Sequence, residues 1–391
     1  MFFLLLVIRS GVHLQYSLWF EHMLTTLKEL DWDFKDSRQS KGLHSIHPYP
    51  AKFIPQIPSQ IIETLGCKDG VILDPFCGSG TTLCVAQSKG YESVGVDLNP
   101  IACLISRVKT TPLGHDFVDA YHQVLKAAVS LEVDVREIDD IPNIDHWFKK
   151  EIQVEVLKLK TAIGMYREHV VIFDALRAAL SSIIVKVSNQ DSDTRYAAVE
   201  KNIPPQKVYS LFETSCINLS KNLIGSDSKV SSTIINKDIL KVSKDEINQT
   251  VGLLVTSPPY PNAYEYWLYH KYRMWWLDFD PQSVKKSEIG ARAHFFKKNH
   301  HTAEDFFHQM KGTLSLANDV LIDSAYAAFV VGRSKIHGEV VDNAQLIIDG
   351  AEELGFDIIG RFDRNMNSSR KSFNLSHANI KKETIVVVQK K

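Results

Sequence analysis

The chain has 391 residues, of which 44% are apolar and 23% are charged. This is the composition of a globular protein with a sizeable core, not of a disordered or fibrous one. Its 45 basic and 46 acidic residues give a formal net charge of −1, which excludes a surface that is basic overall, so contacts with nucleic acid have to come from local clusters of Lys and Arg.

The five cysteines form no C-x-x-C pair and no run with zinc-ligand spacing. An odd, unpaired set of this kind indicates reduced thiols in a cytoplasmic protein, and it gives no reason to expect a metal site.

The chain opens on an apolar run over residues 1–8. The run is too short to span a bilayer, and it has neither the basic start nor the cleavage site of a signal peptide. Met23 begins a more ordinary segment, so we interpret residues 1–22 as a doubtful extension from an upstream start codon. We expect no membrane segment elsewhere.

Residues 70–100 alternate between strand and helix. Short apolar runs at 71–73 and 93–96 predict strands, the segment 81–89 between them predicts a helix ended by Gly90, and Asn99-Pro100 predicts the start of another helix. The alternation predicts an α/β fold with a mostly parallel sheet covered by helices.

Residues 110–231 have a different pattern. Apolar residues recur at helical spacing over 147–163 and 170–187, and turn-rich stretches such as 188–193 separate these segments. We expect a mostly helical insertion. Five further strands are then predicted at 232–236, 252–255, 325–331, 356–359 and 384–388. The last two flank a long polar loop, which is typical of a strand pair at a sheet edge.

A glycine turn lies between the first strand and its helix. Its nine residues are Asp74, Pro75, Phe76, Cys77, Gly78, Ser79, Gly80, Thr81 and Thr82. Glycines let the backbone approach a ligand with no Cβ in the way, and the next helix points free N–H groups at the carboxyl edge of the sheet. A dinucleotide site would need G-x-G-x-x-G, and only Gly78-x-Gly80 is present. Taken alone, such a turn is more often purely structural.

Asp97 ends the next strand. A carboxylate at this place can accept hydrogen bonds from two ribose hydroxyls. Alternatively, it caps the helix that begins at Asn99-Pro100. The turn and the carboxylate together favour an adenosyl ligand that carries no phosphates.

A second motif, Thr256-Ser257-Pro258-Pro259-Tyr260, directly follows an apolar run. The two prolines fix φ and remove two N–H donors, so carbonyls are presented at the strand end beside an aromatic ring. Acceptors on the two N–H groups of a base amine would orient it and stabilise the charge that develops on attack. We assign that role to Ser257 and the Pro258 carbonyl, and stacking on a flipped base to Tyr260. Taken alone, the motif is equally compatible with a stiff turn.

Both motifs resemble those of the DNA amino-methyltransferases, which use S-adenosylmethionine. Residues 74–82 resemble motif I and residues 257–260 resemble motif IV, and the likeness covers 46–109 and 232–391. It implies a Rossmann-like methyltransferase fold with a seven-stranded sheet, in which 23–109 and 232–391 form the catalytic domain and 110–231 is inserted. No cysteine follows a proline, as covalent carbon-5 cytosine chemistry would require.

The resemblance also implies the remaining cofactor contacts. The segment from His47 to Phe53 is similar to the one that closes over the methionine end of the cofactor. Its expected contacts are Tyr49, Ala51, Lys52 and Phe53. At the other end, the resemblance assigns Asp97 to the ribose, with Leu98 and Asn99 beside it, and Asp238 to the adenine amino group.

The target base is left open between two amines. Serine at the first position of motif IV is commoner in cytosine-N4 enzymes of the family and favours that product over N6-methyladenine. An RNA or protein amide methyltransferase and a non-catalytic DNA-binding relative are the other readings. Double-stranded DNA is the expected partner, with a cognate restriction endonuclease as a further possibility.

Contacts with DNA are expected from three places. Residues 110–231 are the candidate for target recognition, although their position before motif IV leaves the permutation class of the family open. Two basic clusters, 285–301 and 361–382, are candidates for phosphate contacts. Most aromatic residues of 264–276 are expected in the buried face of a helix, with Tyr264 as the exception nearest the motif.

Overall fold

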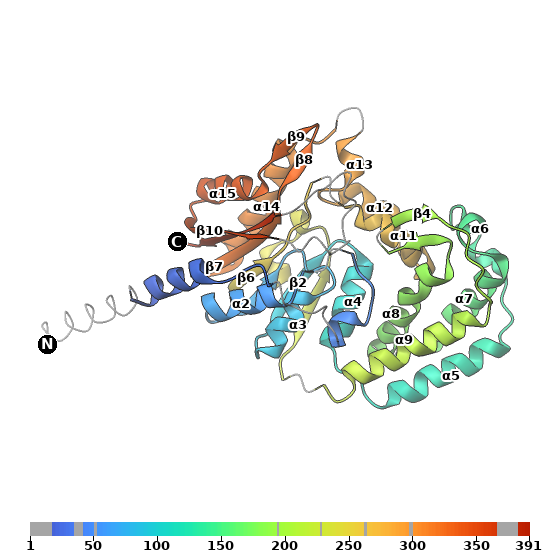
Figure 1. The fold of residues 1–391 in the computed structure, drawn as a ribbon. Helices are drawn as coiled ribbons and strands as arrows, with labels where there is room; N and C mark the ends of the chain where they lie inside the picture. Colours follow the sequence, from blue (N-terminus) through green and yellow to red (C-terminus); the bar gives the residue numbers. More distant parts are fainter. Residues whose placement is uncertain are drawn as a thin grey trace, which may run out of the picture.

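A seven-stranded sheet lies at the centre of the computed structural model, which describes residues 18–34, 42–50, 53–193, 195–226, 229–261, 264–296, 300–365 and 382–391. The strand order is β10-β11-β7-β6-β1-β2-β5 (Figure 1). The strands are β1 (Val71–Asp74), β2 (Ser93–Asp97), β5 (Ser232–Asn236), β6 (Val251–Thr256), β7 (Leu321–Gly332), β10 (Asp357–Asn365) and β11 (Lys382–Gln389). Neighbouring strands are parallel except for β11, which is antiparallel to both β7 and β10. The predicted α/β fold with a mostly parallel sheet is confirmed, as is the strand pair at its edge.

Helices cover both faces of the sheet, because successive apolar residues of a strand point to opposite faces. Ile72 and Leu253 pack with α2 (Gln56–Leu65) and α3 (Thr81–Ser88). Leu73 and Leu254 pack in a separate cluster with α14 (Ala303–Val320) and α15 (Asn343–Glu353). The carboxyl ends of the parallel strands therefore emerge at one edge of a three-layered body, where ligands bind in such sheets.

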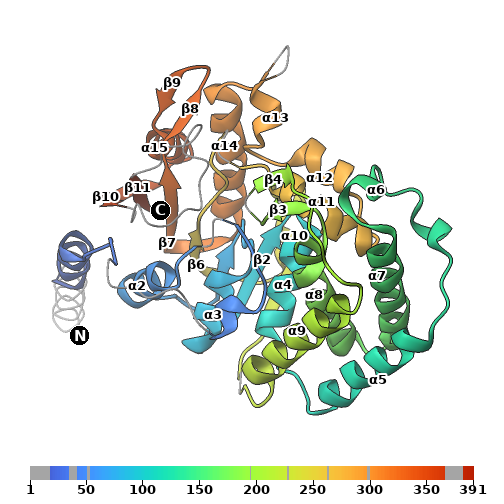
Figure 2. The same cartoon turned by 45° about the vertical axis from the view of Figure 1, so that its right-hand side comes forward.

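The segment between β2 and β5 is mostly helical and lies to one side of the sheet (Figure 2). Its helices are α4 (Pro100–Thr110), α5 (Asp116–Ser130), η2 (Val135–Ile138), α6 (Ile144–Trp147), α7 (Lys150–Ile163), η3 (Gly164–Tyr166), α8 (Val170–Val187) and α9 (Lys207–Leu223). Their apolar faces form one cluster with α11 (Tyr266–Trp276). The boundaries of this region as a domain stay a prediction.

One part of the expected insertion differs. The turn predicted at 188–193 contains β3 (Gln190–Ser192), which pairs antiparallel with β4 (Arg195–Ala198). Six polar residues in a row give no strand period, so this hairpin depends on its neighbours: Arg273 of α11 forms an ion pair with Asp193.

The remaining elements are short. They are η1 (Gly42–Ser45), η4 (Ile239–Lys241), α10 (Lys244–Ile247), α12 (Pro281–Ser287), α13 (Arg292–Phe295), β8 (Ser334–Ile336) and β9 (Glu339–Val341). Residues 18–29 are helical, and Met23 and Leu27 of this segment are buried. Residues 1–17 lie outside the described residues, so the doubtful start stays a prediction. Within the described ranges, no helix is long and apolar enough to cross a membrane.

Candidate active site

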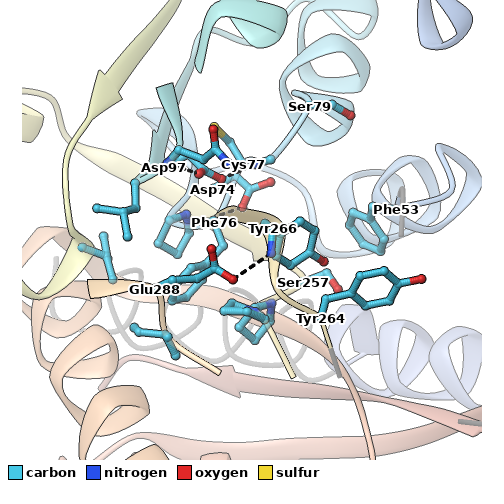
Figure 3. Close-up of a pocket in the computed structure, with 18 of the residues that line it drawn as sticks. Phe53, Asp74, Phe76, Cys77, Ser79, Asp97, Ser257, Tyr264, Tyr266 and Glu288 are labelled. Carbon is cyan, nitrogen blue, oxygen red and sulfur yellow. Dashed lines mark hydrogen bonds between the residues drawn. The ribbon is translucent and has the colours of Figure 1, made fainter. Parts of the chain in front are cut away.

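A pocket at the carboxyl ends of the central strands contains both motifs (Figure 3). Asp74, Phe76 and Asp97 form one side of it, and Ser257, Tyr264 and Glu288 lie on the other (Figure 3). The expected site residues that line it are Tyr49, Phe53, Asp74, Pro75, Phe76, Cys77, Gly78, Ser79, Thr81, Thr82, Asp97, Leu98, Asn99, Asp238, Ser257, Pro258, Pro259 and Tyr260. Gly80 does not line it, and Ala51 and Lys52 fall outside the described residues.

The two motifs are joined by a buried hydrogen bond. Thr256 Oγ1, at the end of β6, donates to Asp74 Oδ1, at the end of β1, over 2.6 Å. Both residues are at most 2% exposed. Burial raises the pKa of Asp74 to about 6, and the hydrogen bonds to its carboxylate oppose that rise. The glycine turn and the proline corner are therefore held at adjacent strand ends.

Helix α4 holds the glycine turn from behind. Gly78 and Gly80 have φ of +50° and +76°, which favour glycine. A Cβ on Gly80 would lie 2.8 Å from Ser106 Oγ. Ser106 Oγ donates to the Gly78 carbonyl over 2.8 Å, and the buried Lys109 Nζ donates to the Ser79 carbonyl over 2.6 Å. These bonds fix the backbone of the turn from the side of α4.

The side chain of Asp97 both accepts a hydrogen bond from the glycine turn and lines the pocket. Its Oδ2 accepts from the Gly78 N–H over 2.9 Å, and its Oδ1 accepts from the Asn99 N–H over 2.8 Å. Each carboxylate oxygen has a second lone pair for a ligand hydroxyl. Burial raises the pKa of Asp97 to about 6. The helix α4 is capped by Asn99 and not by Asp97, since Asn99 Oδ1 accepts from the Ile101 N–H.

Asn99 provides a test of fit for an adenosyl group. The residue is 3% exposed and lines the pocket, and its Nδ2 has no hydrogen-bond partner among the described residues. A buried donor left unpaired is costly, so an acceptor from a ligand is expected there. Asp97 beside it supplies acceptors for ribose hydroxyls. The residues present therefore fit an adenosine, which matches the sequence expectation.

Asp238 lies at the same end of the pocket, after β5. Its Oδ1 accepts from the Leu240 N–H over 3.2 Å, and Lys241 Nζ lies 3.2 Å from its Oδ2. The pocket lining also includes Lys237 and Ile239, which the sequence did not single out. The carboxylate thus lines the pocket, with these contacts made to its own loop, and its role toward adenine stays a prediction.

The segment before motif I reaches the pocket through Tyr49. Its ring stacks on His270 and Tyr266, with centroids 5.0 and 5.9 Å apart. Burial is the main cause that raises its pKa well above 10, followed by the charge of Asp97. A Cβ on Gly78 would contact the Tyr49 ring at 3.6 Å, so this aromatic residue packs directly against the glycine turn.

The proline corner presents Ser257 as an acceptor. Ser257 Oγ donates to the Val330 carbonyl over 3.0 Å, so its hydrogen is engaged and its lone pairs remain. Tyr260 Oη donates to Glu383 Oε1 over 2.9 Å. Burial is the main cause that raises the Tyr260 pKa well above 10, and the Glu383 charge adds to it. The ring is therefore fixed at its hydroxyl end.

Three buried charged residues of the pocket were not identified as site residues from the sequence. Glu288 is buried, accepts from the Tyr266 and Trp267 N–H groups over 2.8 and 2.7 Å, and has a pKa raised by burial to about 8. Arg364 and Glu383, on the adjacent strands β10 and β11, form an ion pair of 2.7 Å. None has a local motif, and only the fold brings them to the pocket.

The aromatic segment is divided as expected. Trp267, Tyr272 and Trp276 are buried in the large helical cluster, whereas Tyr264 lines the pocket. Tyr266 also lines it, which was not foreseen. Trp147, a residue of the candidate recognition region, is buried 4.6 Å from the ring of Tyr196. Trp147 therefore supports the fold, and Tyr196 is half-buried beside it.

The basic clusters are less uniform than the sequence suggests. Lys286 is exposed, whereas Lys285 Nζ lies 4.7 Å from the centre of the Trp267 ring. Arg364, which was placed in a phosphate-binding cluster, is only 5% exposed and belongs to the pocket. That interpretation of Arg364 is wrong, because its ion pair with Glu383 buries it. Lys297, Lys298, Arg370, Lys371 and Lys381 lie outside the described residues.

No group of three or more His, Cys, Asp or Glu residues in the described parts of the chain has the arrangement of a metal site. All the cysteines except Cys67 are buried, and burial raises the pKa of Cys77 well above 9. A thiolate nucleophile is therefore not favoured in this pocket.

Comparison with known proteins gives the same family as the motifs. A family model described as DNA methylase matches residues 17–107. The Type II methyltransferase M.MvaI of Kocuria varians is 27% identical over 281 residues, which are 63% of this chain and 60% of the relative. The Type II methyltransferase M.MjaII of Methanocaldococcus jannaschii is 41% identical over 86 residues, which are 21% of this chain and 16% of the relative.

The matches span 60% or less of the length of these two curated relatives. A solved S-adenosylmethionine-dependent methyltransferase from Methanosarcina mazei aligns with 84% of this chain and 96% of its own, at a TM-score of 0.33 and 10% identity, which is too weak a likeness to add to the sequence matches. With both motifs in one pocket and these sequence matches, the chain is similar to the DNA amino-methyltransferases, whose methyl donor is S-adenosylmethionine.

Proposed function

We propose that the chain is a site-specific DNA methyltransferase that transfers the methyl group of S-adenosylmethionine to N4 of cytosine. One observation carries the proposal: the glycine turn and the proline corner line one pocket and are joined by the Thr256–Asp74 hydrogen bond. A methyl donor bound on the first motif would face an amine held on the second.

The cofactor would lie along the ends of β1, β2 and β5. Asp97 would accept from the ribose hydroxyls, Asn99 Nδ2 would donate to an acceptor of the adenosine, and Asp238 would accept from the adenine amino group. The half-buried carboxylate of Asp97 and the buried, unpaired Asn99 amide support this orientation. Tyr49 would cover the methionine end, since it packs on the glycine turn.

The amine would be held by acceptors at the proline corner. Ser257 Oγ is suited to this role because it already donates to the Val330 carbonyl. The Pro258 carbonyl would accept from the second N–H, and the ring of Tyr260 would stack on the base. When bound, S-adenosylmethionine supplies an electrophilic methyl group on a sulfonium. The residues orient the amine and stabilise the positive charge it gains, and positioning of this kind is a large part of catalysis.

The preference for cytosine rests on Ser257. A neutral hydroxyl stands at the first position of the motif, where family members that methylate adenine more often have Asp or Asn. The buried surroundings of the Ser257–Tyr260 pair suit a neutral acceptor, because a carboxylate there would require a partner of its own.

The product of the reaction tests the proposal. Unmethylated plasmid DNA is incubated with the purified protein and labelled S-adenosylmethionine, then digested, and the nucleosides are separated. We expect N4-methyldeoxycytidine, formed about 100-fold or more slowly by a Ser257→Ala control. N6-methyladenine would overturn the choice of base. Transfer to RNA or protein but not to DNA would overturn the substrate class, and cofactor binding without transfer to any acceptor would favour a non-catalytic relative.

Target recognition is assigned to residues 110–231. Two features support this: the region is mostly helical and lies beside the catalytic sheet, and its hairpin β3–β4 is tied to α11, which begins at the pocket. Exchanging the region with that of a relative is expected to change the methylated sequence. Unchanged sequence specificity in an active chimera would rule the role out. A cognate endonuclease is part of the same proposal.

A further inference from the structure

Arg364 is a buried cation with too few partners. Its side chain is 5% exposed, and its Nη1 donates to Glu383 Oε2 over 2.7 Å. Its Nε is buried and has no hydrogen-bond partner among the described residues. A guanidinium has five N–H donors, and burying an unpaired donor of a charged group is costly. The arrangement therefore points to an acceptor that arrives with a ligand.

The pocket is the place where such a ligand would meet Arg364. Arg364 and Glu383 both line it. Glu383 uses its two oxygens differently: Oε2 accepts from Arg364, and Oε1 accepts from Tyr260 Oη over 2.9 Å. Tyr260 Oη in turn lies 3.5 Å from Ser257 Oγ. The guanidinium is thus connected to the proposed amine-binding serine through two side chains, Glu383 and Tyr260.

We propose that Arg364, oriented by Glu383, donates a hydrogen bond to O2 of the target cytosine and rejects adenine. This inference rests on the proposed cytosine-N4 function. With N4 at Ser257, the Watson–Crick edge of cytosine continues through N3 to O2, which is an acceptor. The same edge of adenine continues from N6 through N1 to C2–H, which accepts nothing. A base flipped from the duplex is commonly read along this edge.

Discrimination follows from the cost of an unpaired donor. Cytosine O2 would satisfy the buried guanidinium, whereas adenine would close the pocket and leave it unpaired. Sites built to hydrogen-bond one ligand reject an analogue that lacks the group much more strongly than apolar pockets reject an extra methylene. Glu383 acts as a positioning residue in this arrangement, because it orients Arg364 and holds the Tyr260 ring.

The test uses the intact protein and a duplex that contains its methylation site, which is identified by sequencing the N4-methylcytosine positions in treated plasmid DNA. One duplex has cytosine at the target and a second has 2-thiocytosine, whose sulfur is a poor acceptor. We expect the wild-type kcat/KM to fall about 10- to 100-fold on the thio duplex, the range for a hydrogen bond from a charged donor.

The variant Arg364→Gln should lose a similar factor on cytosine and little more on 2-thiocytosine, while its affinity for S-adenosylmethionine stays unchanged. If Arg364 had only a structural role, its substitution would leave the ratio of kcat/KM between the cytosine and 2-thiocytosine duplexes unchanged. Arg361→Gln is the matched control, since Arg361 lies on the same strand in an ion pair with Asp342 away from the pocket. Whatever Arg361 contributes to DNA binding, this variant should keep the wild-type ratio of kcat/KM between the two duplexes.

The outcomes separate the two proposals. If the wild type makes N6-methyladenine, the proposed function fails and the inference fails with it. If it makes N4-methylcytosine but Arg364→Gln keeps the full sensitivity to 2-thiocytosine, only the inference fails. If Arg364→Gln does not fold, Arg364→Lys takes its place. The comparison of the wild type on the two duplexes also remains, and a wild-type kcat/KM that is equal on both overturns the inference.

Discussion

Thr256→Val removes the hydrogen bond that joins the two motifs, and its effect should depend on pH. Asp74 has a pKa of about 6 in the folded chain because it is buried, against about 3.9 in an unfolded one. Between about pH 3.9 and about pH 6, Asp74 is therefore protonated in the folded state but ionised in the unfolded state. The free energy of unfolding consequently falls as the pH rises through this range. The Thr256 hydrogen bond limits that loss, because it stabilises the charged carboxylate.

The magnitude follows from the charge state of Asp74. Below about pH 4 the carboxyl is protonated in both states, and the variant should lose about 0.5–1.5 kcal/mol, the net value of a neutral hydrogen bond. At pH 7.5 the bond is made to a buried carboxylate, and the loss should be about 1.5–3 kcal/mol. The substitution should also raise the pKa of Asp74 further, so that the free energy of unfolding continues to fall with pH above pH 6.

The assay is urea-induced unfolding of the full chain at pH 5 and pH 7.5, followed by circular dichroism. Thr384→Val is the matched control: Thr384 Oγ1 donates to Asp363 Oδ1 over 2.7 Å in the same sheet, but Asp363 is exposed. The difference in unfolding free energy between variant and wild type should grow with pH for Thr256→Val and exceed that for Thr384→Val. Equal losses for the two variants at both pH values would refute the reasoning.

Three further predictions concern the site. The association constant for S-adenosylmethionine should fall about tenfold per pH unit below pH 6, because the ribose hydroxyls are proposed to donate to the Asp97 carboxylate, whose pKa burial raises to about 6. Calorimetry on Asp97→Asn should show weak binding that does not depend on pH in this way. Tight binding by the variant would contradict the role of Asp97. Ser257→Ala should lower kcat about 100-fold or more while cofactor affinity, measured in parallel, stays the same; a wild-type kcat would remove Ser257 from the mechanism. Gly80→Ala should lose both thermal stability and cofactor affinity, since φ is +76° and the added Cβ would meet Ser106 Oγ at 2.8 Å; a variant that binds and melts like the wild type would show that the turn tolerates a side chain.

The features that could be predicted from sequence are those with local causes. Apolar runs that end in Asp74 and Asp97 predicted parallel strands, and the carboxyl ends of parallel strands meet at one edge. The glycine turn and Pro258-Pro259 restrict the backbone by themselves, so their shapes could be inferred without the rest of the fold. The predicted sheet and the shared pocket are both found in the structure.

The features that were missed depend on contacts between distant segments. Ser106 and Lys109 stand three residues apart on one helix, and only its packing turns both toward the glycine turn. Arg364 and Glu383 are polar residues at an edge hairpin, where an exposed position is the usual expectation. Their burial follows from the pairing of β10 with β11 beside the proline corner. No local pattern marks such pairs in a sequence.

The relation between the two motifs can be measured most directly in a crystal structure of the protein with S-adenosylhomocysteine. The sulfur should lie between the Gly78–Gly80 turn and Ser257, with the ribose hydroxyls on Asp97 and the adenine beside Asp238. A ligand bound outside this pocket, or bound with its sulfur turned away from the Pro258 carbonyl, would contradict the account.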